Sequence, residues 1–232
     1  MTVVSIHQPN YLPWAGYFRK LIHSNFFVFF DNVQMPGGKS YIYRTAVNLQ
    51  GRSHWLSVST HNKSKFLPIN QIRITERQWI KNHIKTLDLN YAFSPWRGLI
   101  MERIAPILEK EHNYIVDLNI ELIIELLNIM NLNNTTLVRA SELKLEKKGV
   151  DSIDEILQIL NADTYLTGQG RGTARYLDVN HMQKLDINVR YVSNNFPEYS
   201  QHNSGFVPGL SIIDIILNCG PERTRDILLG EC

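Results

Sequence analysis

The sequence has 232 residues, of which 44% are hydrophobic and 10% aromatic, enough chain to bury one sizeable core. Charged residues make up 20%, and the formal net charge is +2, which argues against a disordered chain and against a purely electrostatic binder of nucleic acid or membrane. Two cysteines cannot form a disulfide framework, and no signal peptide or apolar membrane span is recognisable. We therefore expect a cytoplasmic protein without membrane insertion and without a nucleic-acid partner.

The first thirty residues predict a βαβ unit. Residues 3–6 form a short β-branched run and residues 26–30 an apolar run, both typical of buried strands, and residues 17–23 between them are expected to be helical. A strand, a helix and a second strand in this order favour a parallel pair.

The middle of the chain predicts a β-hairpin and three helices. The hairpin is expected from residues 41–48 and 54–59 around the turn 49–52, and the helices from residues 76–91, 96–111 and 115–130. Pro106 lies inside the second helix, where we expect a kink or a restart.

Strands and helices alternate again in the last third. Strands are expected at residues 136–139, 163–167 and 189–192, and helices follow Asp151-Ser152 and begin at Ser211, where Ser211 and Asp214 fit a capping box. The fold class is therefore α/β, with an open, mostly parallel sheet flanked by helices. We interpret residues 1–232 as a single domain, in which about 34–135 form a hairpin and helical insertion or lid.

The loop after the first strand is the most informative segment. His7-Gln8-Pro9-Asn10-Tyr11-Leu12-Pro13-Trp14 combines polar side chains, two prolines and two large aromatic rings. A rigid loop at the carboxyl end of a strand can hold a planar or sugar-bearing ligand at low entropic cost. The alternative is a turn shaped by proline, in which Tyr11 and Trp14 fill the core.

Five segments of the chain carry a family resemblance: HQPNYLPWAGYF, FVFFDNVQ, YIYRTAVNLQG, ADTYLTGQG and LSIIDIILNCGPE. Together they resemble the WbqC-like protein family over nearly the whole chain. The resemblance implies a role in bacterial O-antigen or related surface-polysaccharide assembly, and a transferase that adds glycine or another aminoacyl group to an amino sugar. The segment Met35-Pro36-Gly37-Gly38-Lys39 departs from the family pattern, which puts the local loop geometry and the substrate choice in doubt.

The resemblance also singles out site residues. It points to residues in all five segments and to one central histidine, namely His7, Gln8, Asn10, Tyr11, Trp14, Asp31, Gln34, Arg44, His83, Gly168, Asn218, Cys219 and Gly220.

Three of these residues are the catalytic candidates. His7 is expected to act as a general base or acid, since imidazole titrates near neutrality, or else to hold the loop by hydrogen bonds. Asp31 follows the second strand and would reach the same sheet edge, so that it could orient His7 or, alternatively, cap a turn. Cys219 is a nucleophile candidate for acyl transfer, but its place at a helix C-terminus favours a small buried side chain.

Two further features are candidates for ligand binding. Gly168-Gln169-Gly170-Arg171-Gly172 follows a predicted strand, and its glycines with Arg171 and Arg175 could hold a diphosphate, or form an ordinary turn. Asp214 and Asn218 share one helical face with Ser211 and could line a cleft or face solvent. His83 shares a stripe with apolar residues and could equally belong to the core. The histidine and cysteine spacings match no metal motif, so no metal is expected.

These observations lead to a hypothesis with two alternatives. The hypothesis is a transferase that moves an acyl or aminoacyl group, with glycyl as the candidate, onto a nucleotide-linked amino sugar. The donor is left open between coenzyme A, an acyl or peptidyl carrier-protein thioester and an ATP-derived adenylate, and a homo-oligomer is left open as well. The alternatives are an ATP-dependent nucleotide-binding ligase and a non-catalytic carbohydrate-binding protein that stacks sugars on Tyr11, Trp14 and Trp96.

Overall fold

A parallel β-sheet forms the centre of the molecule. The computed structural model describes residues 1–61, 67–170, 173, 177–202 and 205–230. The sheet order is β5-β2-β1-β6-β7, and the strands are β1 (Val3–His7), β2 (Phe26–Phe29), β5 (Thr136–Arg139), β6 (Thr164–Thr167) and β7 (Asn188–Tyr191). All four pairings are parallel. The predicted α/β class with an open parallel sheet is therefore confirmed.

The residues of the central strands explain why they form a sheet. Val4 and Ile6 of β1 and Phe27, Val28 and Phe29 of β2 are all buried. Strands covered on both faces are apolar at successive positions rather than at alternating ones. His7 aligns with Phe29 in the register of β1 and β2, so the polar loop after β1 begins where the apolar strands end.

The strand order creates a switch point between β1 and β6. From β1 the chain proceeds to β2 and β5 on one side of the sheet, and it later adds β6 and β7 on the other side. The loops after β1 and β6 therefore diverge from a shared edge. In open parallel sheets, ligands bind in the crevice at this position.

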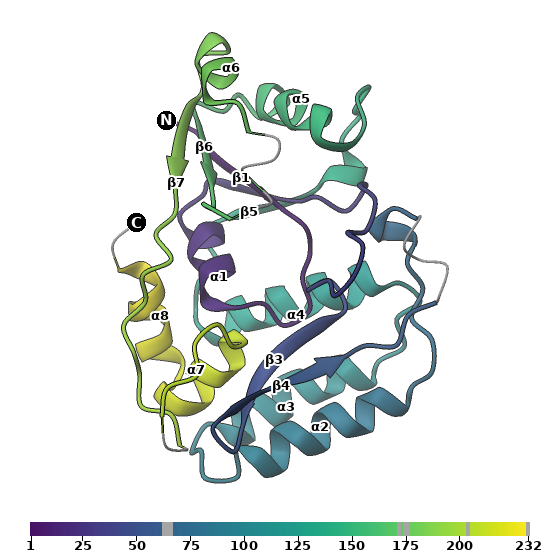
Figure 1. Cartoon of the computed structure of the whole chain (residues 1–232), viewed down its shortest axis with the longest axis vertical. Coiled ribbons are helices and arrows are strands. Elements are labelled where there is room, and N and C mark those ends of the chain that lie inside the picture. The colour runs from purple at the N-terminus through teal and green to yellow at the C-terminus, as the bar shows by residue number, and fades with distance from the viewer. Residues whose placement is uncertain (62–66, 171–172, 174–176, 203–204, 231–232) are drawn as a thin grey trace.

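The chain between β2 and β5 carries a hairpin and three long helices. The hairpin consists of β3 (Arg44–Leu49) and β4 (Arg52–Ser57), which pair antiparallel. Gln50 and Gly51 connect them with φ of 51° and 75°, the left-handed conformation that tight hairpin turns require. The helices are α2 (Gln78–Asn90), α3 (Arg97–Glu109) and α4 (Ile115–Ile129), and α2 and α3 lie with the hairpin at the end of the molecule farthest from α6 (Figure 1).

Five shorter α-helices complete the fold within the described residues. They are α1 (Ala15–Ile22), α5 (Ser152–Ile159), α6 (Val179–Lys184), α7 (Ile212–Cys219) and α8 (Pro221–Leu229). Figure 1 shows α5 and α6 beside the sheet, with α7 and α8 together along one side of the molecule. In the described part of the chain, no helix is both apolar enough and long enough to span a lipid bilayer.

Two prolines mark where the helices continue or begin anew. Helix α3 is continuous through Pro106, so no restart occurs there; the turn before it, at Glu102, is exposed, so water can satisfy the carbonyl that loses its N–H partner. Helix α7 ends before Gly220, and α8, for which the sequence predicted no helix, follows at once. Gly220 has a φ of 85° and Pro221 occupies the first helical turn, so the pair changes direction and starts a new helix.

Candidate functional site

A cavity of about 730 Å³ lies at the carboxyl edge of the sheet, at the switch point. His7 and Gln8 after β1 and Gly168 and Gly170 after β6 contribute to its wall. The rest of the lining is mainly apolar and includes Ile6, Phe30, Val33, Pro36, Val150, Ile153 and Val192. Its volume is typical of small-molecule sites. A shallower hollow of about 450 Å³ over α3 and α4 contains none of the residues predicted from the sequence.

His7 is held in the cavity wall by aromatic rings. Its imidazole stacks on Tyr17, with 4.8 Å between ring centroids, and meets the edge of Trp14 at 5.8 Å. Among the described residues its Nδ1 has no hydrogen-bond partner. Burial and then the nearby charge of Lys20 hold the pKa of His7 well below its usual value. The ring is therefore uncharged at neutral pH and retains a nitrogen that can accept a proton.

Lys20 also lines the cavity, although it was not among the site residues predicted from the sequence. It projects from α1, is 5% exposed and donates from Nζ to the carbonyl oxygen of Ile6 at 3.0 Å. Burial lowers the pKa of its amine to about 7. Lys20 follows Gly16 by four residues and Tyr17 by three, so all three share a helical face. That spacing, directly after the polar loop, was the available signal.

Neutral polar groups complete the lining. Gln8, Gln34, Thr173 and Asn194 contribute amides and a hydroxyl, which suit the hydroxyl and carbonyl groups of a sugar or nucleotide. A Cβ at Gly16 would lie 2.6 Å from Oδ1 of Asn194, so that glycine permits a close contact at the wall. A Cβ at Gly168 or Gly170 would contact nothing within 4 Å, which leaves room for a ligand beside the backbone.

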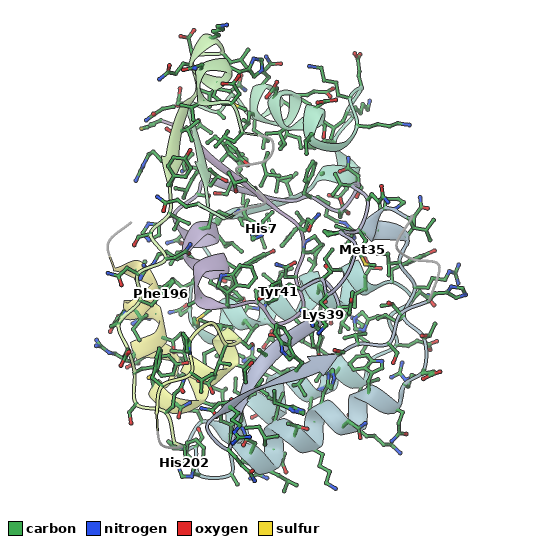
Figure 2. All side chains as sticks on the ribbon, viewed as in Figure 1. His7, Met35, Lys39, Tyr41, Phe196 and His202 are labelled. Carbon is green, nitrogen blue, oxygen red and sulfur yellow. The ribbon has the colours of Figure 1, made fainter. Side chains whose placement is uncertain are left out.

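A row of aromatic rings extends from the cavity to the hairpin. Trp14 and Tyr41 lie 5.2 Å apart between centroids, and Tyr41 and Trp55 lie 5.7 Å apart. Tyr41 is 43% exposed and lines the cavity, and Figure 2 shows it between His7 and the hairpin. The guanidinium of Arg44 stacks on Trp55 at 4.0 Å. Arg44 itself is not among the residues that line the cavity.

The structure corrects the predicted pairing of Asp31 with His7. The Asp31 carboxylate accepts from Nε of Arg139 at 3.1 Å, and from the backbone N–H and the hydroxyl of Ser141 at 2.9 and 2.7 Å. Arg139 also binds Asp117. Asp31 does lie at the same sheet edge, but its charge is neutralised by β5 and the loop that follows. Its role here is to join the ends of β2 and β5, and it does not line the cavity.

Tyr11 and His83 belong to the core rather than to the cavity. The Tyr11 hydroxyl lies 2.9 Å from Nδ1 of His83, and both side chains are buried beside Trp79. Burial raises the pKa of Tyr11 and lowers that of His83 to about 4. Asn10 is buried as well and does not line the cavity. Tyr11 thus fills the core, as the alternative interpretation of the loop after the first strand predicts.

Asp214 lies in a buried polar network and not on a cleft or a solvent face. Its carboxylate accepts from the hydroxyls of Tyr91 and Tyr199 at 2.5 and 2.6 Å, and from Nε2 of Gln201 at 3.2 Å. One side of the predicted capping box is therefore present: Ser211 Oγ accepts a hydrogen bond from Ile213 N–H. The Asp214 carboxylate does not return to the helix start but accepts from Tyr91, Tyr199 and Gln201. Asn218 donates to the Asp214 carbonyl and accepts from His202 N–H.

The remaining candidates do not reach the cavity or lie outside the described residues. Cys219 is half-buried at the end of α7, and burial raises the pKa of its thiol, which opposes the thiolate that a nucleophile requires. The predicted roles of Arg171 and Arg175 fall outside the described residues. Within the described part of the chain, no group of three or more His, Cys, Asp and Glu side chains could hold a metal ion.

Comparisons with known proteins agree with the family resemblance. The chain is 27% identical over 225 residues to Uncharacterized protein Rv1507c of Mycobacterium tuberculosis (strain ATCC 25618 / H37Rv), a match that covers 96% of both chains. No solved structure matches the chain significantly. The model of the WbqC-like protein family matches residues 8–226, from the polar loop after β1 to the last helix. The chain thus belongs to the WbqC-like protein family.

Proposed function

We propose that the chain is a transferase that moves an acyl or aminoacyl group, glycyl in the first instance, onto the amino group of a nucleotide-linked sugar during surface-polysaccharide assembly. The single observation that carries the proposal is an uncharged His7 in the wall of a cavity at the switch point of the sheet. Family membership supports the pathway, and the cavity supports the chemistry.

His7 supplies the proton acceptor for amine attack. As the sugar nitrogen forms its bond to the acyl carbon, the bond from that carbon to its thiol or phosphate leaving group breaks, and the nitrogen loses a proton. An uncharged imidazole can take that proton, whereas an imidazolium cannot. Stacking on Tyr17 and the edge of Trp14 hold the ring in place, a role that we had expected Asp31 to fill.

The cavity lining supports binding of the sugar nucleotide. Gln8, Gln34 and Asn194 can form hydrogen bonds with sugar hydroxyls, and Trp14 and Tyr41 present ring faces and edges to a sugar or a base. The glycine backbone after β6 provides open space at the same edge. Bound there, the acceptor amine would be held near His7, and positioning of this kind accounts for much of the rate in group transfer.

The test is a transfer assay read by mass spectrometry. A UDP-linked amino sugar is incubated with three glycyl donors: glycyl-coenzyme A, a glycyl carrier-protein thioester, and glycine with ATP. His7→Gln should lower turnover about a hundredfold or more, as loss of a general base does, and should retain sugar-nucleotide binding in a thermal-shift assay. His202→Gln is the matched control, since His202 stacks on Phe93 far from His7 (Figure 2).

Two results would contradict the proposal. Transfer by His7→Gln at the rate of His202→Gln would remove His7 as the base. No transfer by the unsubstituted chain with any of the three donors would remove the transferase assignment itself.

A second candidate, an ATP-dependent nucleotide-binding ligase, is favoured by the strand order. Counted as the chain enters the sheet, the order is third, second, first, fourth, fifth, which matches all but the last strand of the order in dinucleotide-binding folds. Two results together would identify this reaction. Glycine with ATP would be the one productive donor, and AMP or ADP would be released only when the acceptor is present.

A further inference from the structure

Lys20 is a cation that protein groups satisfy only in part. Its Nζ makes one hydrogen bond among the described residues, to the carbonyl oxygen of Ile6, although an ammonium group carries three N–H donors. The side chain is 5% exposed and lines the cavity. Two donors are therefore left for water or for a ligand in the cavity.

No carboxylate in the described part of the chain neutralises Lys20. The ion pairs of the described residues do not include it, and the lining of the cavity contains neither Asp nor Glu. The ring of Phe27 lies 5.9 Å from Nζ. A buried ammonium without a counter-charge is costly to maintain, and a bound anion would remove that cost.

The surroundings of Lys20 suit an anion in other respects. The first turn of α1, at Gly16, lines the same cavity, and the N-terminus of a helix carries a partial positive charge. Thr173 and the backbone at Gly168 and Gly170 add neutral groups across the cavity. Arg19, the neighbouring cation on α1, is held by the carbonyl oxygens of Ser193, Asn195 and Ile227, whereas Lys20 lines the cavity and is the Lys or Arg side chain that does so among the described residues.

From this arrangement we infer that the Lys20 ammonium binds an oxyanion of the ligand, a phosphate or a carboxylate, at the base of the cavity beside His7. The inference deepens the proposed function and rests on it for the identity of the ligand, because a nucleotide-linked sugar carries a diphosphate. The oxyanion site itself is tested by binding alone, without turnover. Its failure is therefore distinguishable from failure of the transferase assignment.

The test compares two substitutions of the same chemistry. Lys20→Met removes the charge and keeps most of the side-chain volume, and Lys85→Met makes the same change on the exposed face of α2. Binding of pyrophosphate, UDP and glucuronate is measured by titration calorimetry near pH 6, where the amine is charged. Lys20→Met should weaken binding of an oxyanion probe about tenfold or more, while Lys85→Met should bind as the unsubstituted chain does.

The probes identify the source of the oxyanion. If Lys20→Met loses binding of pyrophosphate and UDP but keeps binding of glucuronate, the site binds phosphate. If it loses binding of glucuronate but keeps binding of pyrophosphate and UDP, the site binds carboxylate. Equal binding by Lys20→Met and the unsubstituted chain would overturn the inference. Absence of binding by the unsubstituted chain to all three probes at millimolar concentration would overturn it too.

A footprinting experiment on the unsubstituted chain covers the case in which Lys20→Met does not fold. Cyanate carbamoylates amines in their uncharged form, and mass spectrometry locates the modified lysines. Pyrophosphate or glucuronate should slow carbamoylation of Lys20 by about tenfold and leave that of Lys85 unchanged. Equal modification of Lys20 with and without both anions would contradict the oxyanion site.

Discussion

The Tyr11 hydroxyl and Nδ1 of His83 lie 2.9 Å apart in the core, and this contact distinguishes buried polar residues that support the fold from those that line the cavity. Most polar atoms buried in a protein core are paired, because an unpaired one costs free energy. Among the described residues, Nδ1 of His7 has no hydrogen-bond partner and Nζ of Lys20 has one; both side chains line the cavity, and we propose that a ligand completes their pairing. Burial lowers the pKa of His7, Lys20 and His83 alike, so position at the cavity, and not the direction of the pKa shift, separates the two roles.

His83 should make stability depend on pH. Its pKa is lowered from 6.5 to about 4, so the unfolded chain takes up a proton as the pH falls below 6.5 while the folded chain does not. The free energy of unfolding should therefore fall by about 3 kcal/mol between pH 6.5 and pH 4 from this group alone. His83→Gln should reduce that slope, measured by urea denaturation across the range.

The control for this prediction is His202→Gln, because His202 is exposed and its ring stacks on Phe93, away from His83. That variant should keep the slope of the unsubstituted chain, to which His7 and His23 also contribute, since burial lowers their pKa as well. An unchanged slope in His83→Gln would contradict a buried, uncharged His83.

At the scale of elements, α7 is joined to the rest of the molecule by polar groups at its N-terminal end. Ser211 donates from Oγ to the carbonyl oxygen of Leu12 at 2.8 Å, and its N–H donates to the Ala46 carbonyl. Asp214 binds Tyr91 from the loop after α2, and Tyr199 and Gln201 from the loop before α7. These contacts connect the polar loop after β1 with the hairpin and the C-terminal helices.

Asp214→Ala should destabilise the fold without removing a group from the cavity. The substitution leaves the hydroxyls of Tyr91 and Tyr199 and the Gln201 amide without their shared acceptor, and unpaired buried donors of this kind cost about 2 to 4 kcal/mol in total. The midpoint of thermal unfolding should fall accordingly, while binding of a cavity ligand by the folded fraction should persist.

Asp151→Ala is the matched control, because Asp151 is exposed before α5 and its side chain makes no cap hydrogen bond. Its effect should stay within about 0.5 kcal/mol. If the two variants are equally stable, the hydrogen bonds of Asp214 do not contribute to the free energy of unfolding.

For the molecule as a whole, the cavity lowers the free energy of unfolding, because it buries ionisable side chains that are better solvated in the unfolded chain. Lys20 is the clearest case, since its ordinary pKa of 10.5 is lowered to about 7 on folding. The unfolded chain holds that proton up to pH 10.5, whereas the folded chain releases it near pH 7. Stability is therefore lost as the pH falls from about 10 to about 7, and stays at the lower value below that range.

Lys20→Met should accordingly stabilise the unliganded chain. Removal of the buried amine should raise the free energy of unfolding by on the order of 3 kcal/mol at pH 7, and the gain should shrink as the pH approaches 10. Denaturation at several pH values measures the difference, with Lys85→Met as the neutral comparison. A variant less stable than the unsubstituted chain at pH 7 would show that the bond to Ile6 outweighs the cost of burial.

Much of the fold could be predicted because its signals are local. The apolar runs of β1 and β2, the hairpin turn at Gln50 and Gly51 and the helical spacing of α2 each depend on neighbouring residues, which fix backbone preference and the side chains that share a face. The continuation of α3 through Pro106 and the start of α8 at Pro221 also have local causes, since water can satisfy the exposed carbonyl and Gly220 lets the chain change direction. The expected position of the site at the edge after β1 followed from the polar loop and from the parallel pairing of the first two strands.

What the sequence determined by itself is therefore the class of fold, the family and the loop that carries His7. The tertiary structure decided which polar side chains meet: Asp31 binds Arg139 and Ser141, 108 and 110 residues away, and Tyr91 binds Asp214, 123 residues away. Partners so distant in the chain are set by packing, because no local periodicity relates them. For the same reason, it is the packing of α1 against β1, where Lys20 donates to the Ile6 carbonyl, that decides that Lys20 lines the cavity.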